Sequence, residues 1–222
     1  MRSYLILGAG KFGRLALARL SACDPAARFV IVDQNPAALE ALPSDGERRV
    51  ERIAAEVTTF LREHLANFAS WDWLIPMMPV HVALARLMAE PAALDWEIMA
   101  APQEVESLAP SAVRGPQGEV YLSRATHLCP DDCPAPEDFC PVTGESRTPA
   151  LYEELAAMDL SGFQIIVMAS RQLAPGVGGY PPGELAALPT EIAEIHSNLL
   201  IATACRCHGV VHALRRRKGQ SR

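Results

Sequence analysis

Five of the six cysteines fall into two clusters whose spacing suits metal binding or thiol chemistry. Cys129, Cys133 and Cys140 have the spacing C-x3-C-x6-C, and a proline follows each of them. Proline restricts the backbone, so a loop stiffened in this way can present several sulfurs toward one point with a smaller loss of entropy. Cys205 and Cys207 form the second cluster, and on a strand they would point to the same face. We therefore expect these five thiols to form one site.

A thiol-ligated metal is the chemistry that we favour for this site, as either an iron–sulfur cluster or zinc. Cys-Pro recurs at iron–sulfur ligands, whereas the C-x2-C pair typical of zinc knuckles is absent. His127 and His208 lie beside the two clusters, and His127 is a further candidate ligand. Redox-active thiols, a disulfide and inert buried thiols remain open as alternatives.

A glycine motif near the start of the sequence predicts a nucleotide site. Gly8-Ala-Gly10-Lys-Phe-Gly13 follows the apolar run Tyr4–Leu7 and opens an amphipathic helical pattern over Lys11–Ser21. The first glycine permits a tight turn, the second allows close approach of a pyrophosphate, and the third allows the helix to pack on the strand. The amides at the start of the helix would then bind the phosphates.

Asp33 is the acidic partner that this motif requires. It lies twenty residues after Gly13, at the end of a second apolar run, where its carboxylate could accept hydrogen bonds from ribose hydroxyls. Gln34 and Asn35 follow it, with no arginine to take a 2′-phosphate, so NAD is favoured over NADP. ATP, S-adenosylmethionine and a purely architectural glycine turn remain open.

Two further residues are candidates for catalysis. His81 follows the expected strand Trp73–Ile75, at the edge of the sheet where ligands bind in open α/β proteins, and could transfer a proton. Arg171 follows the expected strand Phe163–Met168 in a glycine-rich segment and could bind an anionic substrate. The alternatives are a histidine that merely opens a helix and a glycine-rich surface turn.

The elements that must position these residues alternate between strands and helices in the first hundred residues. This order predicts an α/β fold with a Rossmann-like parallel sheet, whose fifth strand would be Trp96–Met99. Near Pro102 prolines and glycines become frequent, so we predict a dinucleotide-binding domain over 1–102 and a smaller α+β domain with the cysteine cluster over 103–222. Further elements are expected at Pro36–Leu42, Arg48–Ile53, Ala55–Phe68, Val80–Met88, Glu119–Ser123 and Leu151–Met158, with a hairpin over Leu199–His212.

The glycine motif and the second strand resemble the NAD-binding domain of potassium-uptake regulators of the TrkA/RCK type and, less closely, Rossmann domains of the saccharopine dehydrogenase type. The resemblance covers about the first forty residues closely. It implies that Gly8, Gly10, Gly13 and Asp33 contact a nucleotide. The cysteine-rich second half departs from those regulators.

Composition limits the remaining function classes. The chain has 222 residues and a formal net charge of −6, which argues against nucleic-acid binding. No apolar run reaches the roughly 18–20 residues of a membrane span, and we expect a cytoplasmic protein. A small-molecule ligand or substrate is the expected partner, with a second copy or a redox partner protein left open. We predict an NAD(H)-binding oxidoreductase with a metal centre; the alternative is a nucleotide or redox sensor with structural zinc.

Overall fold

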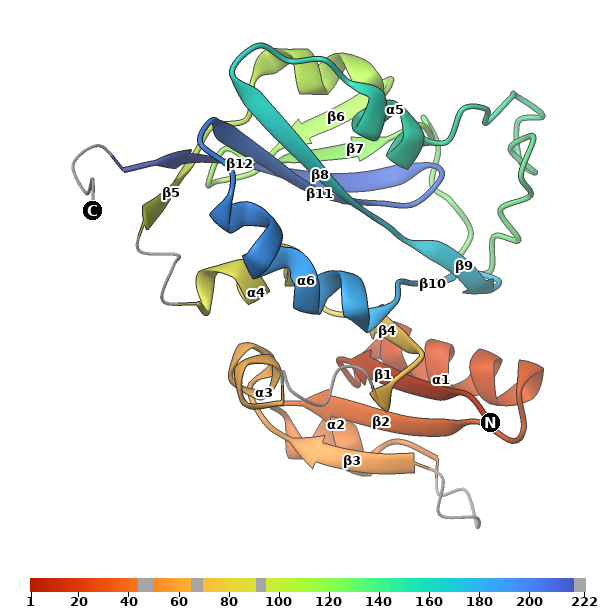
Figure 1. The fold of residues 1–222 in the computed structure, drawn as a ribbon. Helices are drawn as coiled ribbons and strands as arrows, with labels where there is room; N and C mark the ends of the chain where they lie inside the picture. The colour runs from red at the N-terminus through yellow and green to blue at the C-terminus, as the bar shows by residue number, and fades with distance from the viewer. Residues whose placement is uncertain (44–49, 65–69, 91–94, 218–222) are drawn as a thin grey trace.

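Two β-sheets lie one above the other in the computed structural model, with helices between them and on their outer faces (Figure 1). The structure describes residues 1–43, 50–64, 70–90 and 95–217. Arg48, at the start of one expected strand, and residues 65–68, at the end of one expected helix, lie outside the described residues.

The first sheet is parallel and has the order β3-β2-β1-β4, which is the order of the first half of a Rossmann fold. The two central strands, β1 and β2, are continuous buried apolar runs, whereas the edge strand β3 carries the exposed residues Glu51 and Arg52. The strands are β1 (Ser3–Leu7), β2 (Arg28–Asp33), β3 (Val50–Ala54) and β4 (Trp73–Pro76), and the helices are α1 (Lys11–Cys23), α2 (Pro36–Glu40), α3 (Val57–Glu63) and α4 (Val82–Met88). The predicted α/β class and parallel sheet are thus confirmed.

The expected fifth strand of this sheet belongs to the other sheet. β5 (Trp96–Met99) pairs antiparallel with β12 (His208–Arg216). Glu97 lies opposite Arg215 and forms an ion pair with it, while the Arg216 guanidinium lies 5.1 Å from the centre of the Trp96 ring. These cross-strand contacts favour the antiparallel register over a place beside β4. On β4 itself, Leu74 instead exchanges two backbone hydrogen bonds with Tyr180.

The second sheet has the order β6-β7-β12-β11-β8, and β5 also pairs with β12. β8 and β11 are parallel and are connected through the β9–β10 hairpin and α6, whereas the other pairs are antiparallel. The elements are η3 (Gln103–Leu108), β6 (Ser111–Arg114), β7 (Val120–Ser123), α5 (Leu151–Ala157), β8 (Phe163–Ala169), β9 (Arg171–Ala174), β10 (Val177–Gly179), α6 (Pro182–Ala193) and β11 (Asn198–Ala204). The predicted hairpin over Leu199–His212 is confirmed, with its turn at 205–207 rather than at His208-Gly209.

The largest apolar core lies between the two sheets and takes residues from both sides of residue 102. α4 and α6 pack there, between β1 of the first sheet and β11 of the second (Figure 1). Alternate residues of β11 face this core and a second core under α5 and η3. The predicted boundary at residue 102 stays a prediction. In the part of the chain that the structure describes, no helix has the length and apolar character that a membrane crossing needs.

Candidate functional site

The glycine motif adopts the geometry that each of its glycines was predicted to serve. Gly8 has a φ of +106°, and a Cβ there would lie 2.7 Å from the Met77 carbonyl oxygen. A Cβ on Gly13 would lie 1.9 Å from the Gly8 carbonyl oxygen, so only glycine lets α1 approach the loop this closely. Gly10 differs, because a Cβ there would meet nothing within 4 Å. The loop is therefore tight at both ends and open in the middle.

The open middle of the loop is the beginning of α1. Gly10 is the N-cap residue and offers no side chain to the first amides of the helix. The Asp33 carboxylate is anchored to the same loop: one oxygen accepts from the Ala9 amide at 2.7 Å and the other from the Asn35 amide at 2.8 Å. Each carboxylate oxygen keeps acceptor capacity for a further donor. The exposed start of α1 and the fixed carboxylate at the end of β2 thus lie beside each other.

The segment between β7 and α5, residues 124–150, contains Cys129, Cys133 and Cys140 and is here called the cysteine loop. It meets the β11–β12 turn because β7 pairs with β12. His208 lies opposite Ser123 in that pairing, and the Arg124 amide donates to the Cys207 carbonyl oxygen at 2.8 Å. His127 and Cys129 follow β7 closely along the chain and so lie beside the turn. Cys140 returns to the same place through a turn in which its carbonyl oxygen accepts from the Gly144 amide at 2.8 Å.

Five of these side chains form a continuous series of sulfur–nitrogen contacts. His127 Nε2 lies 4.0 Å from both Cys129 Sγ and Cys140 Sγ. Cys129 Sγ lies 3.6 Å from His208 Nε2, and the other ring nitrogen of His208 lies 3.8 Å from Cys205 Sγ. Among the described residues, no three His, Cys, Asp or Glu side chains form a group that could hold a metal ion as they stand. All six cysteines lie in the described part of the chain, and all are free thiols, so the predicted disulfide alternative is not present.

Two of the thiols have lowered pKa values. Burial alone would raise the pKa of Cys140, but the hydrogen bond from the Arg147 guanidinium and those from the Thr143 and Val142 amides outweigh it and lower the pKa to about 6. Burial also opposes ionisation of Cys205, yet hydrogen bonds from His208 lower its pKa. Burial and neighbouring thiols instead raise the pKa of Cys129. The cluster therefore contains thiols of contrasting acidity.

Cys133 and Cys207 do not join the series of contacts. The Cys133 carbonyl oxygen accepts from the Gly176 amide at 3.0 Å and from Gln172 Nε2 at 2.7 Å, so Cys133 anchors the loop to the β9–β10 hairpin through its backbone. In the described chain, neither thiol has a hydrogen-bonding contact with another member of the cluster. The expectation of five converging thiols thus gives way to three thiols and two imidazoles, because the turn geometry decides which side chains face inward.

The two predicted catalytic residues lie apart. His81 Nδ1 lies 3.0 Å from Nδ1 of His212, and its Nε2 lies 3.0 Å from Thr203 Oγ1. Burial, and to a lesser degree the charge of His212, lower the pKa of His81 to about 3, so its ring is neutral. Arg171 lies exposed on β9, and no contact with His81 is found in the described part of the chain. The structure does not bring the two together into one site.

A contact between the cysteine loop and α1 was not predicted from the sequence. Lys11 Nζ lies 2.6 Å from an oxygen of the Asp131 carboxylate, and Arg19 Nη1 donates to the Asp131 and Pro175 carbonyl oxygens at 2.6 and 2.9 Å. Lys11 is the first residue of α1, immediately after Gly10. Asp131, between Cys129 and Cys133, thus contacts the first residue of α1, where the phosphates are predicted to bind.

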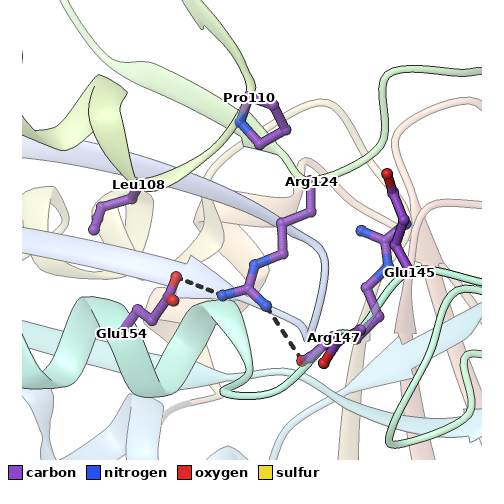
Figure 2. Close-up of a pocket in the computed structure, with 7 residues that line it drawn as sticks. Leu108, Pro110, Arg124, Glu145, Arg147 and Glu154 are labelled. Carbon is purple, nitrogen blue, oxygen red and sulfur yellow. Dashed lines mark hydrogen bonds and ion pairs between the residues drawn. The ribbon is translucent and has the colours of Figure 1, made fainter.

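Arg124 and Arg147 line a polar hollow of about 390 Å³ (Figure 2). Arg124 projects into it, forms an ion pair with Glu154 and donates to the Arg147 carbonyl oxygen at 3.2 Å. Arg147 is only 3% exposed and links this hollow to Cys140. The hollow was not predictable from sequence patterns, since its lining comes from four separate segments. Its residues are Leu108, Pro110, Arg124, Glu145, Ser146, Arg147 and Glu154.

Comparison with known proteins finds relatives of undescribed activity. Residues 70–217 match the family AF_1314_C, described as "Uncharacterized protein, C-terminal domain". This range includes the cysteine cluster and begins after the glycine motif. An "Uncharacterized protein" of Archaeoglobus fulgidus is 31% identical over 225 residues, which cover 96% of this chain and 99% of that protein. No solved structure matches the chain.

Proposed function

We propose that this chain, which belongs to the family described as "Uncharacterized protein, C-terminal domain", is an NAD(H)-binding sensor. In this proposal the cysteine loop responds to the bound nucleotide. The observation that carries the proposal is the start of α1, where open amides follow Gly10 and where Lys11 pairs with Asp131 of the cysteine loop. A pyrophosphate bound at the helix amides would attract Lys11. Nucleotide binding would therefore compete with the contact that holds the loop.

The choice of NAD(H) rests on Asp33. Its carboxylate is held at the end of β2 by the Ala9 and Asn35 amides, beside the glycine loop. Ribose hydroxyls can donate to such a carboxylate, whereas a 2′-phosphate would be repelled by it. Gln34 and Asn35 supply no cation to offset that repulsion. The resemblance to potassium-uptake regulators agrees with a regulatory role, and no transport partner is proposed.

An oxidoreductase is the second candidate, favoured by the thiols of lowered pKa. The half-buried Cys205 thiol is activated by His208, as in a nucleophilic or redox-active cysteine. The sensor is preferred because both ring nitrogens of His81 are engaged by His212 and Thr203. The proposal therefore assigns no proton transfer to His81.

Substitution of Gly10 tests nucleotide binding without disturbing the fold. Since a Cβ at this position meets no atom within 4 Å, Gly10→Val should fold normally but place a branched side chain where the phosphates approach. We expect calorimetric titration to show binding of NADH by the natural protein and at least a roughly tenfold loss in the variant, equivalent to about 1.4 kcal/mol. Gly183→Val is the matched control, because a Cβ at Gly183 in α6 also meets nothing within 4 Å.

Two assays with NADH separate the two candidate functions: the rate of thiol modification and the consumption of NADH. For a sensor, NADH should change the rate at which a disulfide reagent modifies the cysteine loop, and Gly10→Val should abolish that change. Steady consumption of NADH in the presence of an electron-accepting dye would instead favour the oxidoreductase. Equal NADH affinity in Gly10→Val and the natural protein would mean that the glycine loop is architectural.

A further inference from the structure

We infer that a single tetrahedral metal ion, with the chemistry of zinc, binds to Cys129, Cys140, His127 and His208. Cys205 lies beside this set and orients His208. The site goes beyond nucleotide binding and does not depend on it, because none of its residues belongs to the glycine loop. It also differs from the set of five thiols that the sequence predicts.

Three pairs of donor atoms in this set lie 3.6–4.0 Å apart, so the described side chains do not hold an ion as they stand but need only a local contraction to surround one. With zinc–sulfur bonds of about 2.3 Å and zinc–nitrogen bonds of about 2.0 Å, two ligands of one tetrahedral ion have their donor atoms about 3.6 Å apart. The contact between Cys129 Sγ and His208 Nε2 is 3.6 Å. The two contacts of His127 Nε2 are 4.0 Å each, so a small contraction would bring this nitrogen and both sulfurs onto one ion.

The fold holds the two halves of the site in fixed relation. His127, Cys129 and Cys140 come from the loop between β7 and α5, and His208 begins β12. The pairing of β7 with β12 fixes the distance between the start of that loop and the turn. The Cys140 segment is closed by two backbone hydrogen bonds of 2.8 Å, one with Gly144 and one with Glu145. A ligand set assembled by a sheet loses less entropy on binding than one on free loops.

Neighbouring groups hold the His208 ring and the Cys140 sulfur in place through hydrogen bonds. Nδ1 of His208 lies 3.8 Å from Cys205 Sγ, so its N–H donates to that sulfur and the lone pair of Nε2 is left facing Cys129. Cys205 Sγ also accepts from the His208 amide at 3.3 Å. Arg147 donates to the sulfur of Cys140. Hydrogen bonds of this kind fix the tautomer and orientation of metal ligands.

A single ion fits this geometry better than an iron–sulfur cluster. In two-iron clusters with two histidines, the histidines bind one iron and the cysteines the other, so imidazole and thiolate belong to different metals. Here one imidazole nitrogen is equally close to two sulfurs, and the second imidazole contacts one of the same sulfurs. Two thiolates and two neutral imidazoles also balance the double positive charge of zinc, as in Cys₂His₂ sites.

The test is a metal titration of the full chain after removal of metal with a chelator. We expect one equivalent of zinc to bind, and one equivalent of cobalt to give the intense visible bands of tetrahedral cobalt with thiolate charge transfer. His127→Ala and His208→Ala should each weaken zinc binding at least about tenfold, and Cys205→Ser should weaken it to a smaller degree. Cys133→Ser and Cys207→Ser are the matched controls, since they remove neighbouring thiols and should leave affinity unchanged.

Circular dichroism of each variant separates loss of a ligand from loss of the fold. A histidine variant that keeps the natural spectrum yet binds cobalt without the tetrahedral bands supports the site. The inference is overturned if the two control variants lose zinc while the histidine variants keep it, if no stoichiometric zinc binds to folded protein, or if anaerobically purified protein contains iron and acid-labile sulfide. No nucleotide is present in these measurements, so their outcome is independent of NADH binding.

Discussion

His81 and His212 form a buried pair that links the two halves of the molecule. Their Nδ1 atoms lie 3.0 Å apart and their rings are stacked, so one ring donates its proton to the other and the two have opposite tautomers. Burial lowers the pKa of His81 to about 3 and also lowers that of His212, where the charge of Glu119 partly offsets it. Both rings are therefore neutral in the folded protein at neutral pH.

Stability should fall as the pH is lowered below the pKa of about 6.5 that histidine has in the unfolded chain. There the unfolded chain binds protons that the folded protein excludes, so the free energy of unfolding decreases with falling pH until the folded pKa of His81, about 3, is reached. Between pH 7 and pH 5 we expect a loss of about 2 kcal/mol from His81, measured by urea unfolding at each pH.

Replacement of both His81 and His212 measures how much of the pH dependence of stability comes from these two histidines. His81→Asn together with His212→Asn should flatten the slope, since asparagine keeps hydrogen bonding but does not titrate. His196→Asn removes an exposed histidine and should leave the slope unchanged. An equally steep loss of stability in the double variant would mean that other groups cause it.

The β9–β10 hairpin is the element that supports the cysteine loop. Gly176 at its turn has a φ of +65°, and a Cβ there would lie 1.8 Å from the Asp131 carbonyl oxygen. The Gly176 amide also donates to the Cys133 carbonyl oxygen. The loop and the hairpin thus approach more closely than any side chain on Gly176 would permit.

Gly176→Ala should therefore release the cysteine loop. Gly144→Ala is the matched control, because Gly144 has a φ of +74° but a Cβ there would meet nothing within 4 Å. We expect the control to lose about 1 kcal/mol from the positive φ alone, and Gly176→Ala to lose at least about 1 kcal/mol more. Urea unfolding measures both, and faster modification of the loop cysteines should accompany the larger loss. Equal losses would show that the close approach is not needed.

Strands and helices with a regular pattern of apolar residues were predicted from the sequence, and those without such a pattern were missed or misplaced. The strands β1, β2 and β8 were predicted within two residues of their ends, because each contains a run of at least four apolar residues, which in β1 and β2 is also buried. α6 was not predicted, since Pro189 lies inside it and interrupts the helical pattern, and burial of Leu185, Leu188 and Ile192 compensates. β5 was placed in the wrong sheet, because its partner, β12, is more than a hundred residues away.

In the candidate sites, too, features that depend on neighbouring residues were predictable and features that depend on distant strand pairing were not. The glycine turn and its approach to Asp33 were predictable from the β1–α1–β2 pattern, whereas the close approach of Gly8 to Met77 depends on the pairing of β1 with β4, which lies more than sixty residues further along the chain. The cysteine cluster was predictable only as two segments, because spacing does not determine which side chains face inward. The inclusion of His208 and the exclusion of Cys133 follow from the β7–β12 register and from the β9–β10 hairpin.

The largest apolar cluster takes residues from both large sheets. Leu84 and Leu87 of α4 pack in the same cluster as Leu185 and Leu188 of α6, although the first pair lies within the predicted first domain. Separation of the halves would expose this cluster to water. We therefore expect both sheets to unfold together.

Leu87→Ala tests this cooperativity. Leu87 is fully buried between the sheets, so its truncation should lower the free energy of unfolding by about 2–5 kcal/mol. Hydrogen exchange of β2 amides, which reports on the first sheet, and of β11 amides, which reports on the second, should show loss of protection at the same denaturant concentration. A shift in the first-sheet signal alone would show that the predicted domains unfold separately.

The central position of β12 has a consequence for synthesis on the ribosome. β12 pairs with β5, β7 and β11, yet it is the last strand of the described chain to be translated. The parallel β1–β4 sheet can assemble while translation continues, whereas β5 and the edge of β7 that does not pair with β6 must wait for β12. The nascent second half therefore passes through an interval with open strand edges, and the inferred metal site, which includes His208 of β12, can form only after that interval ends.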